Sequence, residues 1–454
     1  MKLFLASSLF NRGKNSSEIL RLFEVILETA PDFSATLLTK ERVYEKVFLE
    51  NVMVPARLEK LISDLNQHLR SFALLQQYFS ARNEEQQQVD WAKWLRTNGL
   101  TESASKTLAK LKSKKGQEKT ESLELFHNNL LIAEEEHELE CVQNLLKGDV
   151  QISNLIYHLD LYYYNYRIEL KNRYLLQQKG AHLPDLAIAE VGLNFYQKDS
   201  ILLQISEKIH ELFKKDSPSV PELQEMIELL HKHENEISFQ TLSQMHAYLR
   251  SACTMLINAG NLGLISILHE IQKDNLPRGY FFINGEISPQ VYVNMVQVAT
   301  RVKEYEWAKE FTEEFRERII GGDQGEFFYH FNMAHCLFSE GKFEEALDHI
   351  PEAPSSSHYH HMLRRLELKL YYELHADLLL YKMDAFRKYI DRTATKTISA
   401  NLRTMDLNFL NILMQLSQSP LKDKDRSERI IKRIESKKLL ADRAWLLEKA
   451  QELG

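Results

Sequence analysis

The sequence contains little proline and glycine for its length. Its 454 residues include 10 Pro and 15 Gly, and no proline occurs between Ala56 and Leu183. Interior proline breaks helices, and strand-rich folds need glycine in their turns, so this distribution favours long helices joined by short connections. We therefore expect an all-α protein.

Cysteine is scarce, and long hydrophobic runs are missing. Cys141, Cys253 and Cys336 are odd in number, far apart and without zinc-site spacing, which is typical of buried thiols in a reducing compartment. No run reaches the roughly 20 apolar residues of a membrane helix. The opening Met1–Phe10 has a short, Ser-rich apolar run without a convincing cleavage site. These features predict a cytoplasmic protein that does not enter a membrane.

The charge balance gives no positive field for a polyanion. The chain has 57 Lys and Arg against 64 Asp and Glu, a formal net charge of -7. Nucleic acid as a partner would therefore need local evidence. Phosphate-binding loops, nucleophile elbows and zinc-protease helices are absent from the sequence. We expect neither catalysis nor a cofactor.

Helical periodicity divides the chain into three predicted regions. Residues 1–83 form an amino-terminal helical region, residues 84–216 a long-helix region, and residues 217–454 a repeat region. The proline-interrupted link Asp216–Pro221 marks the second boundary, and Ser219 is positioned to cap the next helix. Asn15 is a similar candidate cap near the amino terminus, where Glu18 follows three residues later.

A helix–turn–helix signature recurs three times in the last region. The turns Lys303–Ala308, Gly341–Ala346 and His375–Leu380 lie 38 and 34 residues apart, and 34 is the tetratricopeptide period. A small residue such as Ala308 or Ala346 lets paired helices approach closely. Leu380 replaces it in the third copy, so we expect that pair to pack differently. The predicted architecture is a tetratricopeptide-like α-solenoid.

A short β-hairpin should precede the first repeat. Asn284-Gly285 lies between aromatic and β-branched residues, which is a type I′ hairpin signal. Ser288 and Pro289 then suit the N-cap and first position of the following helix.

The first helix of each repeat should line a polar, net basic groove. Amide, imidazole and cationic side chains can hydrogen-bond an extended peptide backbone or pair with a carboxylate. We expect the groove to bind an unidentified protein or peptide, although an ordinary solvated face is the competing interpretation. The candidate groove residues are Asn294, Gln297, Arg301, Asn332, His335, Arg365 and Lys369.

Two sets of side chains are candidates for metal binding. Acid-x-x-His pairs such as Glu134/His137 recur, but the composition alone produces several of them, and Glu134 to Glu136 are typical of a solvated face. His358, His360 and His361 follow a Ser-rich segment and should lie in a surface loop leading into a helix. Whether they bind metal stays open at this point.

Several segments, in this order, resemble a group of uncharacterised bacterial proteins that are all-helical and tetratricopeptide-like. The matching pieces are Phe4–Asn11, Leu38–Phe48, Ile287–Phe311 and Arg443–Lys449. The resemblance implies helical hairpin repeats and a cytoplasmic bacterial protein, and it brings no catalytic residues. It also implies that the apolar amino terminus belongs to the fold.

A weaker similarity concerns the helices of residues 15 to 80. Leu38–Phe48 followed by Pro55–Leu65 resembles the winged helix-turn-helix of some bacterial transcription activators, so the alternative function is a DNA-linked regulator. Arg57, Lys60 and Arg70 would face the DNA, but Glu59 and Asp64 offset them and no wing is readable. The Tyr-rich segment Tyr162–Tyr166 could be core or a dimer seam, and the oligomeric state stays open.

Overall fold

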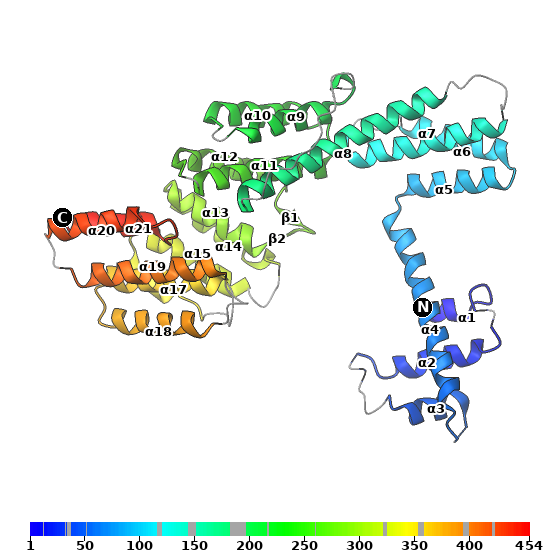
Figure 1. Cartoon of the computed structure of the whole chain (residues 1–454), viewed down its shortest axis with the longest axis horizontal. Coiled ribbons are helices and arrows are strands. Elements are labelled where there is room, and N and C mark those ends of the chain that lie inside the picture. The colour runs from blue at the N-terminus through cyan, green and yellow to red at the C-terminus, as the bar shows by residue number, and fades with distance from the viewer. Residues whose placement is uncertain are drawn as a thin grey trace. The chain divides into compact units, whose positions relative to one another are not determined.

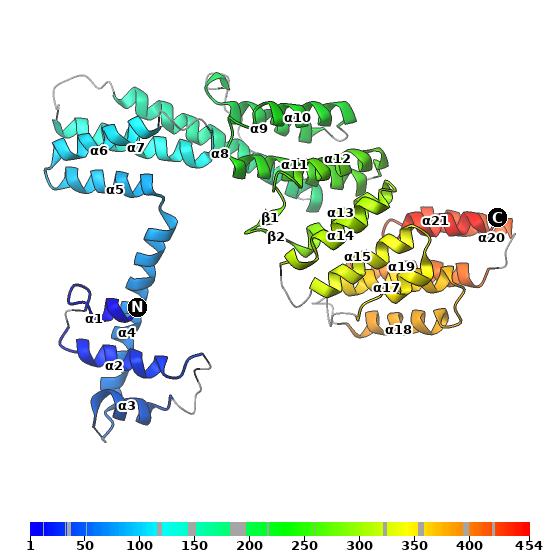
Figure 2. The ribbon, with the colours of Figure 1, turned by 180° about the vertical axis from the view of Figure 1, so that it is seen from behind.

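The computed structural model describes most of the chain and confirms an all-α protein (Figures 1 and 2). The described residues are 1–11, 13–31, 33, 38–50, 52–115, 120–143, 151–181, 197–215, 218–258, 260–320, 325–352, 358–393, 399–419 and 423–454. Within them, one two-stranded hairpin is the only sheet. None of the described helices is long and apolar enough to cross a membrane.

The chain divides into two compact units, Met1–Tyr166 and Arg167–Gly454, with the division inside the continuous helix α8, Gln151–Ala181. Neither predicted boundary, after residue 83 or after residue 216, coincides with this division, and the three-region scheme stays a prediction. The helices before α8 are α1 Lys2–Ala6, α2 Ser16–Leu27, α3 Lys40–Phe48, α4 Pro55–Ala81, α5 Glu84–Thr97, α6 Thr101–Lys115 and α7 Leu123–Gln143.

The apolar amino terminus is part of the first core. Phe4 and Leu5 on α1 are buried with side chains of α2, α3 and α4. Helix α4 runs without a break from Pro55 to Ala81. Asn15 does precede α2, but its side chain makes no capping hydrogen bond, so that part of the prediction is wrong.

Two residues of helix α7 depart from the sequence-based expectation. Cys141 is exposed, whereas Glu135 is buried. Arg96 of α5 explains the buried carboxylate, because its Nε lies 2.6 Å from Glu135 Oε1 and its Nη2 lies 3.2 Å from Oε2. The expectation of a solvated face from Glu134 to Glu136 is therefore wrong at its central residue.

The second unit continues with short helices and helical pairs. Its elements after α8 are the 3-10 helix Gln197–Asp199, α9 Ile201–Lys214, α10 Val220–Lys232, α11 Phe239–Asn258, the 3-10 helix Leu262–Leu264, α12 Ile265–Asn275, β1 Phe282–Ile283, β2 Glu286–Ile287, α13 Pro289–Arg301, α14 Tyr305–Glu314, the 3-10 helix Arg316–Arg318, α15 Gly325–Ser339, α16 Phe343–Asp348, α17 His358–Glu373, α18 Leu379–Arg392, α19 Ala400–Ser417, α20 Lys424–Glu435 and α21 Arg443–Glu452.

Local signals at the start of this unit are confirmed. Ser219 forms a capping box with Glu222 at the beginning of α10, and Ser288 accepts a hydrogen bond from the backbone of Val291 in α13. Asn284 and Gly285 join β1 to β2 with φ angles of 53° and 85°. Two successive positive φ angles are what a type I′ turn requires.

The three predicted repeat turns share one backbone conformation. Lys303, Gly341 and His375 all adopt positive φ angles, of 65°, 82° and 49°. In each turn the next residue donates its amide to the carbonyl five positions earlier, as in Glu304 to Ala299 at 3.0 Å. These are Schellman-type helix ends, in which a left-handed residue redirects the chain into the next helix.

The third turn departs from the other two, as expected. Ala308 and Ala346 are fully buried, whereas Leu380 is half exposed. The reason is the later start of α18: it begins at Leu379, four residues after the left-handed His375, while α14 and α16 begin two residues after theirs. Leu379 is buried there.

Candidate functional site

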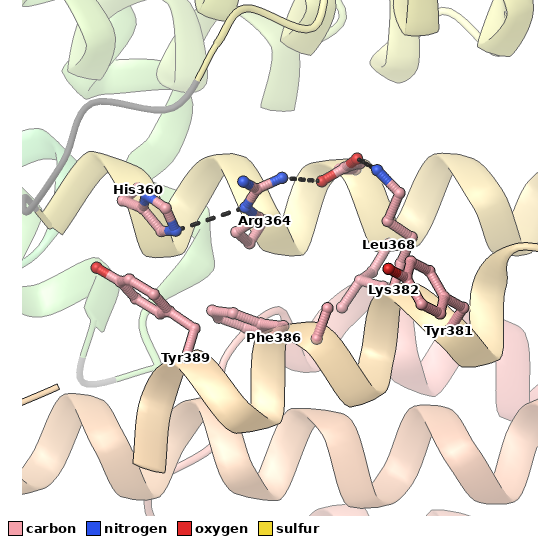
Figure 3. A pocket seen from close by; sticks show the side chains of 9 residues that line it. His360, Arg364, Leu368, Tyr381, Lys382, Phe386 and Tyr389 are labelled. Atoms are coloured by element: carbon pink, nitrogen blue, oxygen red, sulfur yellow. Dashed lines mark hydrogen bonds and ion pairs between the residues drawn. The ribbon is translucent and has the colours of Figure 1, made fainter. Parts of the chain in front are cut away.

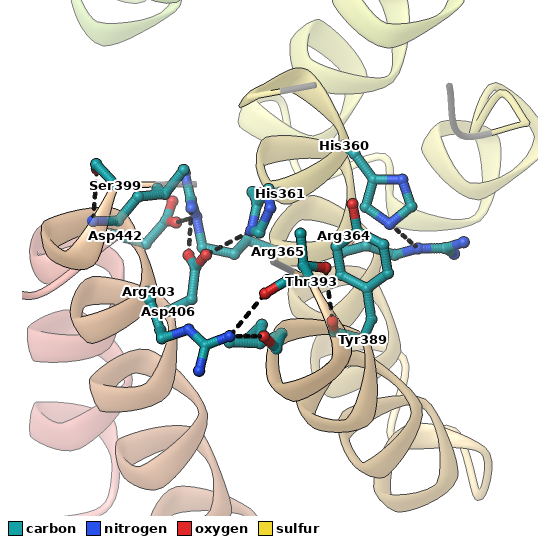
Figure 4. Close-up of polar contacts among 12 residues, drawn as sticks. His360, His361, Arg364, Arg365, Tyr389, Thr393, Ser399, Arg403, Asp406 and Asp442 are labelled. Atoms are coloured by element: carbon teal, nitrogen blue, oxygen red, sulfur yellow. Dashed lines mark hydrogen bonds and ion pairs between the residues drawn. The ribbon is translucent and has the colours of Figure 1, made fainter. Parts of the chain in front are cut away.

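A buried set of charged side chains connects α17, α19 and the segment before α21. His361, Arg365 and Lys369 recur at intervals of four residues and so lie along one side of α17. Asp406 on α19 and Asp442, directly before α21, supply the carboxylates. Figure 4 shows four of these residues together; we call all five the Asp442 cluster.

Each carboxylate of the cluster binds two cationic or imidazole groups. Asp406 Oδ2 accepts from Nδ1 of His361 at 2.7 Å, and its Oδ1 lies 2.5 Å from Nη1 of Arg365. Asp442 Oδ2 accepts from Nε of the same arginine at 2.9 Å, and its Oδ1 accepts from Nζ of Lys369 at 2.7 Å. Arg365 therefore bridges the two carboxylates (Figure 4).

The cluster is charged despite its burial. Burial by itself would raise the pKa of Asp442, but the charges of Lys369 and Arg365 and their hydrogen bonds hold that pKa well below its usual range. Burial likewise opposes the charge of Arg365, yet Asp442 and Asp406 raise its pKa. Buried ions of this kind depend on one another, because each lacks water to replace a lost partner.

Helix α21, which directly follows Asp442, also packs against α17. Trp445 on α21 donates its indole N–H to Oε1 of Glu373 at 2.7 Å, and Nζ of Lys449 lies 3.0 Å from the same oxygen. The ring of Tyr372 meets the Trp445 ring edge-on. The carboxyl-terminal segment thus occupies the side of α17 on which two of the predicted groove residues lie.

Four of the seven predicted groove residues have partners within the chain. Arg365 and Lys369 bind Asp442. Asn332 is fully buried and donates to the backbone carbonyl of Tyr292 at 3.2 Å, so it does not line an open surface as expected. Asn294 is half-buried and accepts from Nε2 of Gln272 at 3.0 Å.

Gln297, Arg301 and His335 are the remaining candidates. Burial lowers the pKa of His335 to about 3, with Lys369 and Arg301 lowering it further and Asp442 opposing them. These charges can act on His335 only because the fold brings α13, α15 and α17 close at these positions. Arg301 is exposed and, among the described residues, its side chain has no hydrogen bond or ion pair. We call these three residues the open positions.

A second polar feature is a cavity of about 240 Å³ between α17 and α18 (Figure 3). Arg364 and Lys382 each lie 2.7 Å from a different oxygen of the buried Glu367. His360 stacks on Tyr389 with ring centroids 4.1 Å apart. Because ligand pockets usually exceed roughly 300 Å³, this cavity suits a single side chain better than a cofactor.

The histidines near residue 360 do not lie in a surface loop. They belong to the first turn of α17, where His360 and His361 are buried by contacts with α18 and α19, so the loop prediction is wrong. The side chain of His358 lies outside the part that the structure describes. Within that part, no group of three or more His, Cys, Asp or Glu side chains could hold a metal ion.

Arg403 of α19 joins its helix to the carboxyl end of α18. Its Nη2 donates to the carbonyls of Ile390 at 2.5 Å and Thr393 at 2.9 Å, at the carboxyl end of α18 (Figure 4). Helix ends leave carbonyls without an intrahelical partner, and a cation is favourable there. This contact holds the start of α19 against the end of α18.

Of the three candidate DNA-contacting side chains in residues 15 to 80, one forms ion pairs within the chain and two are exposed. Arg57 binds Glu50 at 3.1 Å and Glu18 at 2.9 Å and lies 4.1 Å over the Phe48 ring. Lys60 and Arg70 are exposed. Lys106, Lys110, Lys112 and Lys114 form a run of basic residues on α6, where Lys112 pairs with Glu136.

Asp406 and Asp442 were missed by sequence reasoning, since they lie 41 and 77 residues from Arg365. The spacing of His361, Arg365 and Lys369 was the available signal, because three basic residues on one helix side need acidic neighbours when buried. No protein-family model, no curated protein and no solved structure matches this chain. Any function must therefore be inferred from its own residues.

Proposed function

We propose that this protein is a non-catalytic interaction scaffold that binds a protein or peptide through the open positions of its helical pairs. The observation that supports this proposal is the carboxylate of Asp442, which Arg365 and Lys369 hold on one side of α17. One carboxylate of the chain itself is therefore already bound on this side of the helical pairs.

The open positions extend the same chemistry toward earlier helices. Gln297, His335 and Lys369 each stand six residues before the left-handed residue that ends their helix. Lys369 already has its carboxylate, whereas Arg301 on α13 is exposed and His335 on α15 is half-buried within the electrostatic influence of both cations. In a tetratricopeptide-like solenoid, which we include in the proposal, these positions line one continuous groove.

The proposed partner is an extended, acidic peptide segment. Arg301 can pair with a carboxylate in bidentate geometry. His335 is neutral at physiological pH, since its pKa is lowered to about 3, and so can accept as well as donate a hydrogen bond. The Gln297 amide suits a peptide backbone. Cytoplasmic location and relationship to the bacterial tetratricopeptide-like group are parts of the same proposal.

Charge reversal at Arg301 tests the proposal. We expect Arg301→Glu to reduce the recovery of bound proteins from lysate and the affinity for acidic peptides, with helical content unchanged. Lys432→Glu on α20 is a matched control, because Lys432 is also exposed and the substitution changes the net charge by the same amount. Equal loss in both variants, or no loss in either, contradicts the proposal. Arg365 is unsuitable for this test because its reversal breaks the Asp442 cluster.

The DNA-linked regulator remains the alternative hypothesis. The ion pairs of Arg57 with Glu18 and Glu50 occupy one of its three candidate DNA-reading residues. A protein that binds DNA through phosphate contacts loses affinity steeply as salt rises. Salt-dependent binding of duplex DNA by the full chain would therefore favour this alternative over the scaffold.

A further inference from the structure

The cavity between α17 and α18 has one polar wall and one aromatic wall. In Figure 3, His360 and Arg364 on α17 lie opposite Tyr389 and Phe386 on α18. Its volume is about 240 Å³, and all the residues that line it belong to these two helices. We call it the α17–α18 cavity.

The lining of the cavity carries more positive than negative charge. Besides His360, its ionisable side chains near neutral pH are Arg364, Lys382 and Glu367, which are two cations and one carboxylate. Both cations bind that one carboxylate, each at 2.7 Å. The hydrogen bond to Glu367 raises the pKa of Lys382, so the ammonium stays charged. One positive charge of the lining is therefore not balanced within it.

Arg364 has hydrogen-bond donors left for a ligand. A guanidinium carries five N–H groups. Nη1 donates to Glu367, and Nε donates to Nε2 of His360 over 3.4 Å, while Nη2 has no hydrogen-bond partner among the described residues. The neighbouring Arg365 binds two carboxylates, those of Asp406 and Asp442. Arg364 binds one, and its side chain is 35% exposed, so a second carboxylate can reach it from solution.

The opposite wall suits a flat apolar group. Phe386 and Leu368 are buried and line the cavity, and Tyr381 lies at its edge with 70% of its surface exposed. A cavity of about 150 Å³ can hold benzene, so the α17–α18 cavity has room for a single ring with one polar group. Sites for small molecules commonly combine such an apolar wall with a few polar side chains.

We infer that the α17–α18 cavity binds a small aromatic monocarboxylate, with the carboxylate beside Arg364 and Lys382 and the ring against Phe386 and Leu368. One negative charge balances the lining, whereas a dianion would bring a second charge close to Glu367. Benzoate is the simplest acid of this class. The carboxyl-terminal phenylalanine of a peptide offers the same two groups, and N-acetyl-phenylalanine represents that source.

Calorimetric titration of the full chain with these two acids tests the inference. We expect saturable binding with a dissociation constant of about 1 mM or tighter. Benzamide, which has the shape of benzoate without its charge, should bind about tenfold more weakly or worse. Stronger binding of benzoate indicates a free acid as the ligand, and stronger binding of N-acetyl-phenylalanine indicates a peptide terminus.

Two substitutions of the polar wall should act in opposite directions. Arg364→Gln makes the lining neutral and should weaken binding of the acid by about tenfold. Glu367→Gln removes the competing carboxylate and should strengthen it about threefold or more. Opposite signs distinguish a charge effect from general damage to the fold. Arg387→Gln on α18 is the control, because Arg387 does not line the cavity.

Closing the cavity tests its position. Ala385 lines the cavity and is exposed, so Ala385→Trp should block binding while helical content stays unchanged. Ala56→Trp on α4 is the control, since Ala56 is also exposed and lies outside the cavity. The inference is overturned if neither acid binds saturably up to about 10 mM, if benzamide binds as well as benzoate, if binding survives Ala385→Trp, or if Glu367→Gln weakens it. None of these variants changes the open positions, so the outcome is independent of the peptide-binding proposal.

Discussion

Replacing Asp442 by Asn removes one negative charge from the buried cluster and leaves its shape almost unchanged. The backbone at Asp442 is left-handed, with a φ of 49°, a conformation that Asn adopts as readily as Asp. The change therefore tests the charge rather than the backbone. It leaves Lys369, whose side chain is 9% exposed, without its carboxylate, and it leaves Arg365 with Asp406 alone.

The expected loss of stability is large for a single charge. Breaking a buried ion pair on one side costs about 3–5 kcal/mol, because the remaining charge is neither paired nor hydrated. We expect Asp442→Asn to lower the free energy of unfolding of the second unit by about this amount. Asp384→Asn is the control: Asp384 pairs with Lys388 on the exposed side of α18, where such a pair contributes about 0.5 kcal/mol or less.

Urea unfolding followed by circular dichroism and tryptophan fluorescence measures both variants, and Trp445 reports directly from α21. Because the pKa of Asp442 is lowered in the folded state, its contribution is complete above the unfolded value of about 4 and is lost as pH falls below it. The difference between wild type and Asp442→Asn should therefore shrink in acid. A difference below about 1 kcal/mol at neutral pH would refute the reasoning.

Three further predictions concern the repeats, the open positions and DNA. Ala346→Leu should lower the free energy of unfolding by about 1–3 kcal/mol, because the larger side chain overpacks the buried turn. Leu380→Ala should lower it by less than about 0.5 kcal/mol. The urea midpoints of the two variants measure this difference, and equal effects would contradict the difference between the turns. Since burial and the nearby charges of Lys369 and Arg301 lower its pKa to about 3, His335 stays neutral and its NMR signals should not shift between pH 5 and 8. A midpoint near 6.5 would contradict this effect of burial and charge. The full chain should give no salt-sensitive shift of duplex DNA, measured by electrophoresis, because Arg57 is already paired.

Local sequence signals predicted much of the secondary structure, because capping and turn formation depend on contacts between residues that are close in the chain. Pro55 begins α4, Ser219 caps α10, and Asn284-Gly285 turns the hairpin, each through contacts within a few residues. Asn15 shows the limit of such signals, since it stands before α2 without capping it.

The candidate site was only partly readable from sequence. Arg301, His335 and Lys369 were expected on one face, and Lys369 and Arg301 both lie close enough to His335 to lower its pKa; that the three line one groove stays a prediction. Their exposure was not predictable, because it depends on which distant segment covers each helix. Asn332 faces α13 and is buried, and Lys369 is covered by the segment that carries Asp442.

The sequence by itself determined the helical class and the places of the three repeated turns. These depend on residue type and on spacing along the chain. Only the tertiary structure decided which polar side chains are bound internally and which apolar ones stay exposed. Asp442 meets Arg365 across 77 residues. Burial belongs to the packed fold, and no periodicity within one helix specifies its neighbours.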